Sequence, residues 1–348
     1  EGCASRAGAS GVSLVARLHG ALVSLLSTRE ALVLQCVLVA LYNFVQDRHG
    51  SAIGSLACAE SLLRIVADYE PSFKVPAAEL LELLLHSPDF ATIDLPSPCP
   101  RMCEVVAHDG ALVLLSLLHC GDEELPPHLL RSLHRLVAHP PSAKEVRQVG
   151  GIQLLLSVLA PREDGSSPPT DVVIGAVAVL ATLSLDQDAA LQVRKANGVF
   201  LLGKQLLEAA TAPRSPPSPP TPPTLNGVPA AGTTAEPPAP VMAHVFRALR
   251  FLYSMERNRK VFRRLFPPDL FGAFIDLGQY VHELGAYGRL AAQFAALSAE
   301  AHAKIGEAFA DINLDRVRAE QRFVREYAVQ ELLGKGGFGS VYQVKLKG

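Results

Sequence analysis

Three glycines near the end of the sequence have the spacing of a phosphate-binding loop. Residues 333–341 read Leu-Gly-Lys-Gly-Gly-Phe-Gly-Ser-Val, so Gly334, Gly336 and Gly339 form a G-x-G-x-x-G pattern with Val341 two residues later. Backbone N–H groups approach phosphate oxygens closely where no Cβ intervenes, and glycine also tolerates positive φ. The chemistry that this stretch indicates is binding of a nucleotide's phosphates by main-chain amides.

The residues on either side of the glycines distinguish two kinds of nucleotide-binding loop. A dinucleotide-binding loop leads from a strand into a helix, with an acidic residue about 20 positions later. Here residues 327–333 predict a first strand, and residues 340–347, which alternate small, apolar and polar types, predict a second. Strand–loop–strand is the arrangement of protein kinases, and we favour it. A dinucleotide-binding turn and an incidental glycine-rich turn are the alternatives.

Resemblance to the kinase loop implies roles for its side chains and names its cofactors, ATP and Mg²⁺. Phe338 would lie at the tip and close over the γ-phosphate, while Leu333 and Val341 would press on the adenine ring. The nucleotide-binding residues implied are Leu333, Gly334, Lys335, Gly336, Gly337, Phe338, Gly339, Ser340 and Val341. The strand-three lysine, the αC glutamate, the catalytic-loop aspartate and the metal-binding aspartate would lie beyond Gly348. We therefore predict no catalytic and no metal-binding residue in this polypeptide, and expect it to be inactive.

Composition excludes several other classes of protein. The chain has 348 residues, 49% of them hydrophobic, and a net charge of −2, which argues against a nucleic-acid or membrane binder. The apolar stretch 31–45 contains Gln35 and Asn43 and is too short to span a bilayer. The six cysteines are scattered and indicate reduced thiols of an intracellular, cytoplasmic protein. Because the chain begins at Glu1 rather than Met and stops soon after Gly339, we expect a fragment.

An internal repeat runs through the first two-thirds of the sequence. Gly110, Gly151 and Gly198 each precede an apolar stretch, at separations of 41 and 47 residues. A period of 40–47 residues built only of helices is typical of armadillo or HEAT repeats, which stack into a solenoid with an extended groove. We expect each glycine to release the chain between two helices that meet at a sharp angle.

The predicted fold is mostly α: an armadillo-like α-solenoid followed by the first two β-strands of a truncated protein kinase N-lobe. The predicted organisation is armadillo-like repeats at 1–210, a proline-rich disordered insert at 211–240, a last repeat at 241–280, connecting helices at 281–326 and the start of a kinase domain at 327–348.

The proline-rich insert has two interpretations. Residues 213–223 could bind SH3 or WW domains, and Ser215, Ser218 and Thr221 each precede a proline, as substrates of proline-directed kinases do. The alternative, which we favour, is a tolerated insertion between repeat helices, because lengthening such a loop costs little free energy.

Two segments are similar to one kinase family in particular. Residues 248–260 (ALRFLYSMERNRK) and 265–271 (LFPPDLF), together with the glycine-rich stretch, resemble NIMA-related serine/threonine kinases that carry armadillo repeats ahead of the catalytic domain. The resemblance implies a kinase linked to cilia and to cell-cycle or DNA-damage control, located at the ciliary base or in the nucleus. It also implies a solenoid groove that binds protein partners or substrates. A non-catalytic armadillo scaffold is the alternative.

Overall fold

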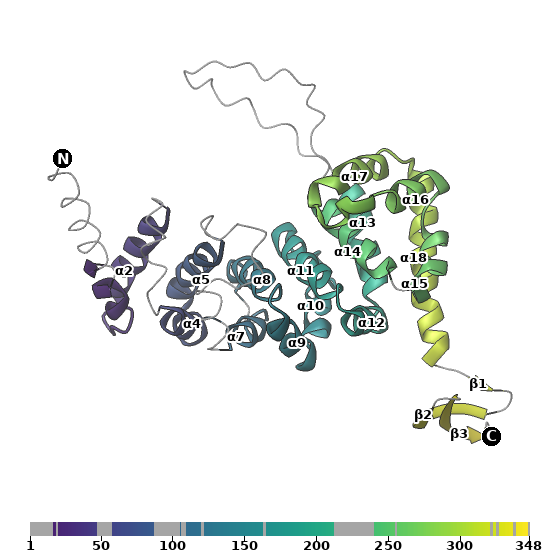
Figure 1. The fold of residues 1–348 in the computed structure, drawn as a ribbon, viewed down its shortest axis with the longest axis horizontal. Helices are drawn as coiled ribbons and strands as arrows, with labels where there is room; N and C mark the ends of the chain where they lie inside the picture. Colours follow the sequence, from purple (N-terminus) through teal and green to yellow (C-terminus); the bar gives the residue numbers. More distant parts are fainter. Residues whose placement is uncertain are drawn as a thin grey trace, which may run out of the picture. The chain divides into compact units, whose positions relative to one another are not determined.

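The structure is a computed structural model, and it divides into two compact units, 1–193 and 194–348, which we describe separately (Figure 1). The residues that it describes are 17–18, 20–46, 58–86, 105, 109–119, 122–162, 165–211, 240–254, 256–320, 323–324, 327–336 and 339–346. Beyond Ile312 the side chains are not described, except that of Gln343.

The described part of the first unit is helical. Its helices are α2 (Ala31–Phe44), α4 (Ala59–Asp68), α5 (Pro71–His86), α7 (Gly110–Ser116), α8 (Leu125–Leu136), α9 (Pro140–Gln148), α10 (Gly151–Val158), α11 (Thr170–Leu183) and α12 (Gln187–Lys195), which reaches the boundary between the units.

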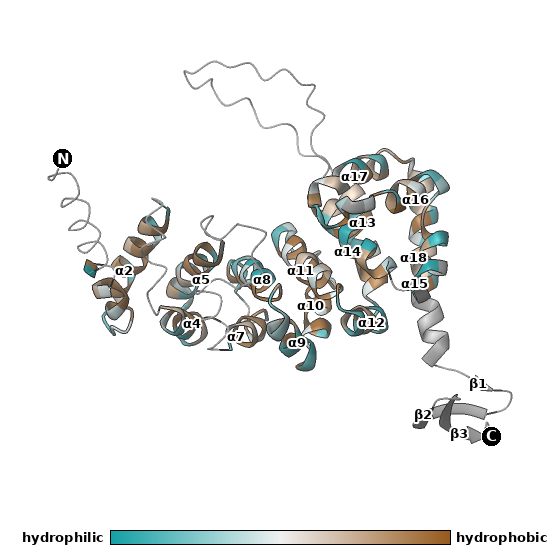
Figure 2. Cartoon of the chain, viewed as in Figure 1, coloured by the Kyte–Doolittle hydropathy of each residue, from teal (hydrophilic) through white to brown (hydrophobic). Residues whose placement is uncertain are grey.

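Prolines and amphipathic patterns explain where these helices begin and which faces they bury. Helices α8 and α9 both carry proline in the first turn, where the missing N–H would be unpaired in any case. Figure 2 shows α9 and α12 as mainly hydrophilic, whereas nearly every residue of α11 from Val172 to Leu183 is buried. The long helices α5, α8 and α11 pack side by side in that order, and the shorter helices α7, α9 and α10 join the stack. This repeated unit of two short helices and one long helix is the packing that the sequence period predicts.

The repeat glycines have a different role from the one that we expected. The left-handed conformation falls one residue earlier, at Asp109 (φ 52°), Gly150 (φ 80°) and Asn197 (φ 67°). Gly151 itself begins α10, and a Cβ there would lie 2.6 Å from the carbonyl oxygen of Val146. The prediction that these glycines release the chain is therefore wrong in mechanism, because the left-handed residue precedes each of them, and Gly110 and Gly151 permit close packing instead.

The second unit contains α13 (Gly198–Thr211), α14 (Pro240–Tyr253), α15 (Glu256–Leu265), α16 (Pro268–Ile275), the 3₁₀ turns η3 (Gly278–His282) and η4 (Leu284–Tyr287), α17 (Gly288–Ala295) and α18 (Ala299–Glu320). Its core is aromatic, in contrast to the mainly aliphatic core of the first unit. The fully buried Phe274 ring lies within 6.4 Å of the rings of five neighbours: Phe246, Tyr253, Phe262, Phe266 and Phe271.

Helix α18 belongs to this core over its first half. It packs against α13 and α15, and its Phe309 ring lies directly over Gly203 of α13, where a Cβ would collide with it. Three strands follow in the order β1 (Phe323–Val324), β2 (Tyr327–Gly336) and β3 (Gly339–Leu346), each antiparallel to its neighbour.

Candidate functional site

The glycine-rich stretch occupies the turn end of the β2–β3 hairpin. Gly336 pairs with Gly339, Lys335 with Ser340, and Gly334 with Val341. The pairing register shifts twice further down the hairpin, between Val329 and Leu332 and again between Leu332 and Gly334. Gly337 and Phe338, which connect the two strands, lie outside the described residues. The three glycines of the motif therefore lie together at one end of a strand–turn–strand unit.

This backbone arrangement fits a phosphate-binding role. No Cβ projects from Gly334, Gly336 or Gly339, so no side chain of these three residues would stand between the backbone and an anionic ligand. The side chains of this segment are not described, so the roles given to Leu333, Lys335, Phe338, Ser340 and Val341 stay predictions. The strands lie where the sequence places them, but that they begin a kinase N-lobe also stays a prediction.

A second candidate site is a set of charged side chains on the long helix α8. Glu82 of α5 accepts a contact of 2.7 Å from His128 Nδ1 and two contacts of 3.4 Å from Arg131 Nη1. Arg131 also lies 3.9 Å from Asp171 of α11. Nearby, His134 Nε2 lies 3.1 Å from the Thr182 hydroxyl. These contacts join α5, α8 and α11, so this set stabilises the stack of long helices.

A third set, which we call the α14 row, comprises His244, Arg247 and Arg250, spaced by three residues along one half-buried face of α14. The helix packs against η3, η4 and α17. The guanidinium carbon of Arg250 lies 5.4 Å from the centre of the Tyr253 ring. Within the described part of the chain, no carboxylate forms an ion pair with either arginine of the row.

Burial changes the ionisation of the α14 row and of the tyrosine beside it. Desolvation and, to a smaller extent, the neighbouring Arg247 charge together lower the pKa of His244 to about 4. Burial also lowers the pKa of Arg247. It raises the pKa of Tyr287 to about 12, against the opposing effect of the Arg250 and Arg247 charges. The row is thus a desolvated cationic surface on which His244 is neutral at pH 7.

The α14 row was not predicted from the sequence, although a signal for it exists. Residues 128–136 (HLLRSLHRL) and 244–252 (HVFRALRFL) share the pattern His-x-x-Arg-x-Leu-x-x-Leu, and each ends a long helix. Comparing the two helices residue by residue would have drawn attention to His244, Arg247 and Arg250.

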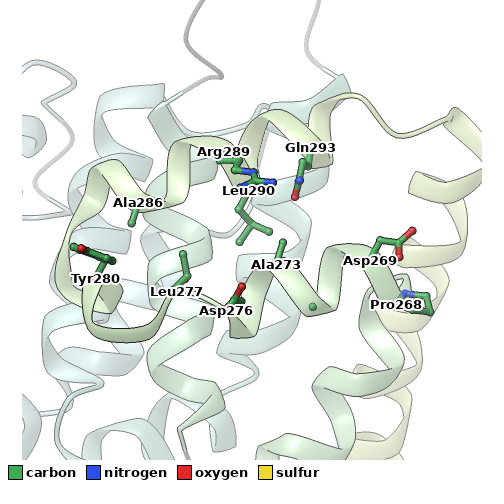
Figure 3. Close-up of a pocket in the computed structure, with 11 residues that line it drawn as sticks. Pro268, Asp269, Ala273, Asp276, Leu277, Tyr280, Ala286, Arg289, Leu290 and Gln293 are labelled. Carbon is green, nitrogen blue, oxygen red and sulfur yellow. The ribbon is translucent and has the colours of Figure 1, made fainter.

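A cleft of about 600 Å³ lies between α16 and α17 (Figure 3). Figure 3 shows Asp269 and Asp276 on one side and Arg289 and Gln293 on the other. Its mixed charges form no catalytic pattern that we recognise, and it contains no residue predicted to be functional.

The remaining predictions concern the proline-rich insert, the cysteines and the absence of a membrane span. Residues 213–223 lie outside the described part of the chain. Cys36 is exposed, Cys58 is buried, and neither forms a disulfide bond. Within the described residues, no helix is long and apolar enough to cross a membrane.

Comparison with known proteins supports both the resemblance to a kinase and the armadillo-like repeats. No family model matches the chain. The chain is 37% identical to the serine/threonine-protein kinase Nek10 of Mus musculus and 36% identical to that of Homo sapiens, each over 168 residues, or 48% of this chain. It is 27% identical to the serine/threonine-protein kinase D1044.8 of Caenorhabditis elegans over 247 residues, or 70% of this chain. The matches span only 13%, 12% and 23% of those relatives.

Solved structures of similar fold are repeat proteins. An engineered protein matches with a TM-score of 0.54 at 18% identity, covering 84% of this chain and 97% of that one. A designed armadillo repeat protein matches with a TM-score of 0.51 at 13% identity, covering 84% and 98%. The predicted solenoid is therefore confirmed. The chain has an armadillo-like fold and, over about half its length, a sequence similar to the NIMA-related kinase Nek10, as the resemblance stated from sequence implies.

Proposed function

We propose that this chain is the regulatory and docking part of an ATP-dependent serine/threonine protein kinase, with an ATP-binding glycine-rich loop at 333–341. The similarity to kinases supports the proposal. The observation that carries it is the hairpin register, which brings Gly334, Gly336 and Gly339 together at a turn between two antiparallel strands. A dinucleotide-binding loop would lead from a strand into a helix instead.

ATP and Mg²⁺ are the cofactors of this proposed kinase. The turn amides of 334–339 would hold the phosphates, and the bound nucleotide would supply the phosphoryl group for transfer. Because the lysine, glutamate and aspartates that orient phosphate and metal are not among the nine loop residues, we expect the 348-residue chain alone to be inactive.

The test is substitution of a loop glycine in the complete kinase. Gly336→Val would place a branched side chain where the phosphates approach the backbone. We expect at least a hundredfold loss of kcat/KM for ATP, measured by radiolabelled phosphate transfer to a generic protein substrate. A Gly272→Ala control, in an open position on α16, should retain parent activity. Equal activity of the parent and Gly336→Val would contradict the assignment.

The solenoid would serve as the docking surface of the kinase for protein partners or substrates. One structurally similar designed armadillo protein was made for modular peptide recognition, which supports a peptide-binding role for this fold. A non-catalytic armadillo scaffold is the second candidate, and deletion of the repeats from the complete protein distinguishes the two. If the proposal holds, deletion changes substrate phosphorylation, whereas a pure scaffold transfers no phosphate with or without its repeats.

Two finer proposals concern regulation and location. For the insert, whose favoured interpretation is a tolerated insertion, the second candidate is that Ser215, Ser218 and Thr221 are phosphorylated and 213–223 binds SH3 or WW domains. A role in cilia, the cell cycle or the DNA-damage response, at the ciliary base or in the nucleus, rests on the family resemblance alone.

A further inference from the structure

Buried nitrogen atoms without a hydrogen-bond partner concentrate on the α14 row. In the part of the chain that the structure describes, six buried side-chain atoms have no hydrogen-bond partner, and three of them are His244 Nδ1, Arg247 Nε and Arg250 Nε. An unpaired buried polar atom costs about 1–3 kcal/mol, and more when the group is charged, so native proteins rarely keep one without a reason. Three such atoms on a single half-buried helix face show that the described residues leave part of the hydrogen-bonding capacity of this face unused.

The folded framework around the row keeps it in place. Tyr253 supports the Arg250 guanidinium from the same helix. The Tyr287 hydroxyl donates a 2.7 Å hydrogen bond to the carbonyl of Val281, so its proton is not directed at the α14 row. The Phe251 and His282 rings meet at 5.5 Å and join α14 to η3. Because the arginines are held in a partly desolvated position, an anion that reaches them binds more strongly than at a fully exposed arginine.

The first unit contains a corresponding histidine and arginine whose partner is a carboxylate of the protein itself. On α8, His128 and Arg131 occupy the same pattern positions as His244 and Arg247 on α14. There the ligand is the Glu82 carboxylate, 18% exposed, which contacts both side chains. The protein therefore shows which chemical group fits a His-x-x-Arg face of this kind, and that group is a carboxylate.

We propose that the α14 row docks an acidic peptide segment of a partner protein, with Asp or Glu carboxylates of that segment paired to Arg247 and Arg250. The proposal rests on the docking role proposed above for the solenoid and names the chemistry of the docked segment. Each guanidinium presents a planar set of donors that matches a carboxylate, and two arginines one helical turn apart can pair with two acidic side chains of one segment.

The test measures binding of a fluorescein-labelled hexaglutamate peptide to the 348-residue chain by fluorescence anisotropy at low ionic strength. We expect saturable binding, little binding of a hexaglutamine peptide, and at least a tenfold loss of affinity in an Arg247→Gln/Arg250→Gln variant. The matched control is Arg263→Gln/Arg264→Gln, which removes two exposed charges from α15 and should change affinity less than twofold. Arg250→Lys keeps the charge but loses the planar fork, so it should weaken binding about threefold even if the double variant fails to fold.

Three results would overturn the proposal. Equal losses in the α14 and α15 variants would mean that only net charge matters. No measurable hexaglutamate binding would exclude a carboxylate site. Much tighter binding of a phosphoserine peptide through the same arginines would replace the carboxylate by a phosphoryl group. The assay uses neither ATP nor phosphate transfer, so its failure leaves the kinase assignment intact, and a failed kinase assay leaves this result intact.

Discussion

Helices α8 and α14 share the pattern His-x-x-Arg-x-Leu-x-x-Leu but differ in the electrostatic surroundings of its histidine and arginine. On α8, the carboxylate of Glu82 lies 2.7 Å from His128 and 3.4 Å from Arg131. On α14, the corresponding His244 and Arg247 keep buried nitrogen atoms without a partner among the described residues. The pattern within a helix fixes which residues face outward, whereas the neighbouring helix decides whether those residues are structural or available for binding.

The largest expected effect is a loss of stability in acid that originates at His244. Its folded-state pKa of about 4 lies below the usual 6.5, so its stabilising contribution is complete above pH 6.5 and is lost as the pH falls to 4. The total loss is on the order of 2–3 kcal/mol. Urea unfolding at pH 7 and at pH 4.5 should show a smaller difference in His244→Gln than in the parent.

The comparison helix supplies the control for this measurement. His128→Gln also removes one histidine, but from the face that Glu82 covers, and should retain the acid-side loss of the parent. If His244→Gln and the parent lose the same stability between these pH values, desolvation of His244 is not the cause.

Removing the built-in carboxylate should have the next largest effect. Glu82→Gln leaves His128 and Arg131 without their anion, and we expect the free energy of unfolding to fall by about 2 kcal/mol. Glu79→Gln, one turn earlier on α5, should cost less than about 0.5 kcal/mol. An equal cost for both substitutions in urea unfolding would mean that the Glu82 contacts contribute nothing specific.

The parts of the fold that depend on local sequence were predictable. The 41- and 47-residue separations of Gly110, Gly151 and Gly198 indicate stacked helices, and the alternation in 340–347 indicates a strand. Both patterns are formed by residues of a single strand or of neighbouring repeats, so they can be recognised without knowledge of distant contacts. The glycines nevertheless misled us about the left-handed residue, because a requirement for φ > 0 and a requirement for a missing Cβ both select glycine. Asp109 and Asn197 meet the first, and Gly151 meets the second.

The parts that depend on distant neighbours were not predictable. The contact between Glu82 and His128 joins residues 46 positions apart, and the sequence gives no sign of that pairing. The ring cluster around Phe274 gathers phenylalanines from α14, α15 and α16, each of which reads as an ordinary apolar helix position. Of the candidate site, the glycine motif is visible in a single stretch of chain, whereas the α14 row became apparent only when the partner of each charge was known.

The smallest expected effect tests the comparison most directly. The same substitution, arginine to methionine, should raise stability on α14 and lower it on α8. Arg247→Met removes a guanidinium whose Nε is buried without a partner and keeps an apolar stem of similar length, so stability should rise by about 0.5–1 kcal/mol. Arg131→Met removes a guanidinium that is paired with Glu82, so stability should fall by about 1 kcal/mol. Thermal melting should resolve the pair as shifts of a few degrees in opposite directions. If both variants lose stability, then Arg247 already has a structural role in the free protein, and the α14 row is not a binding site for a ligand.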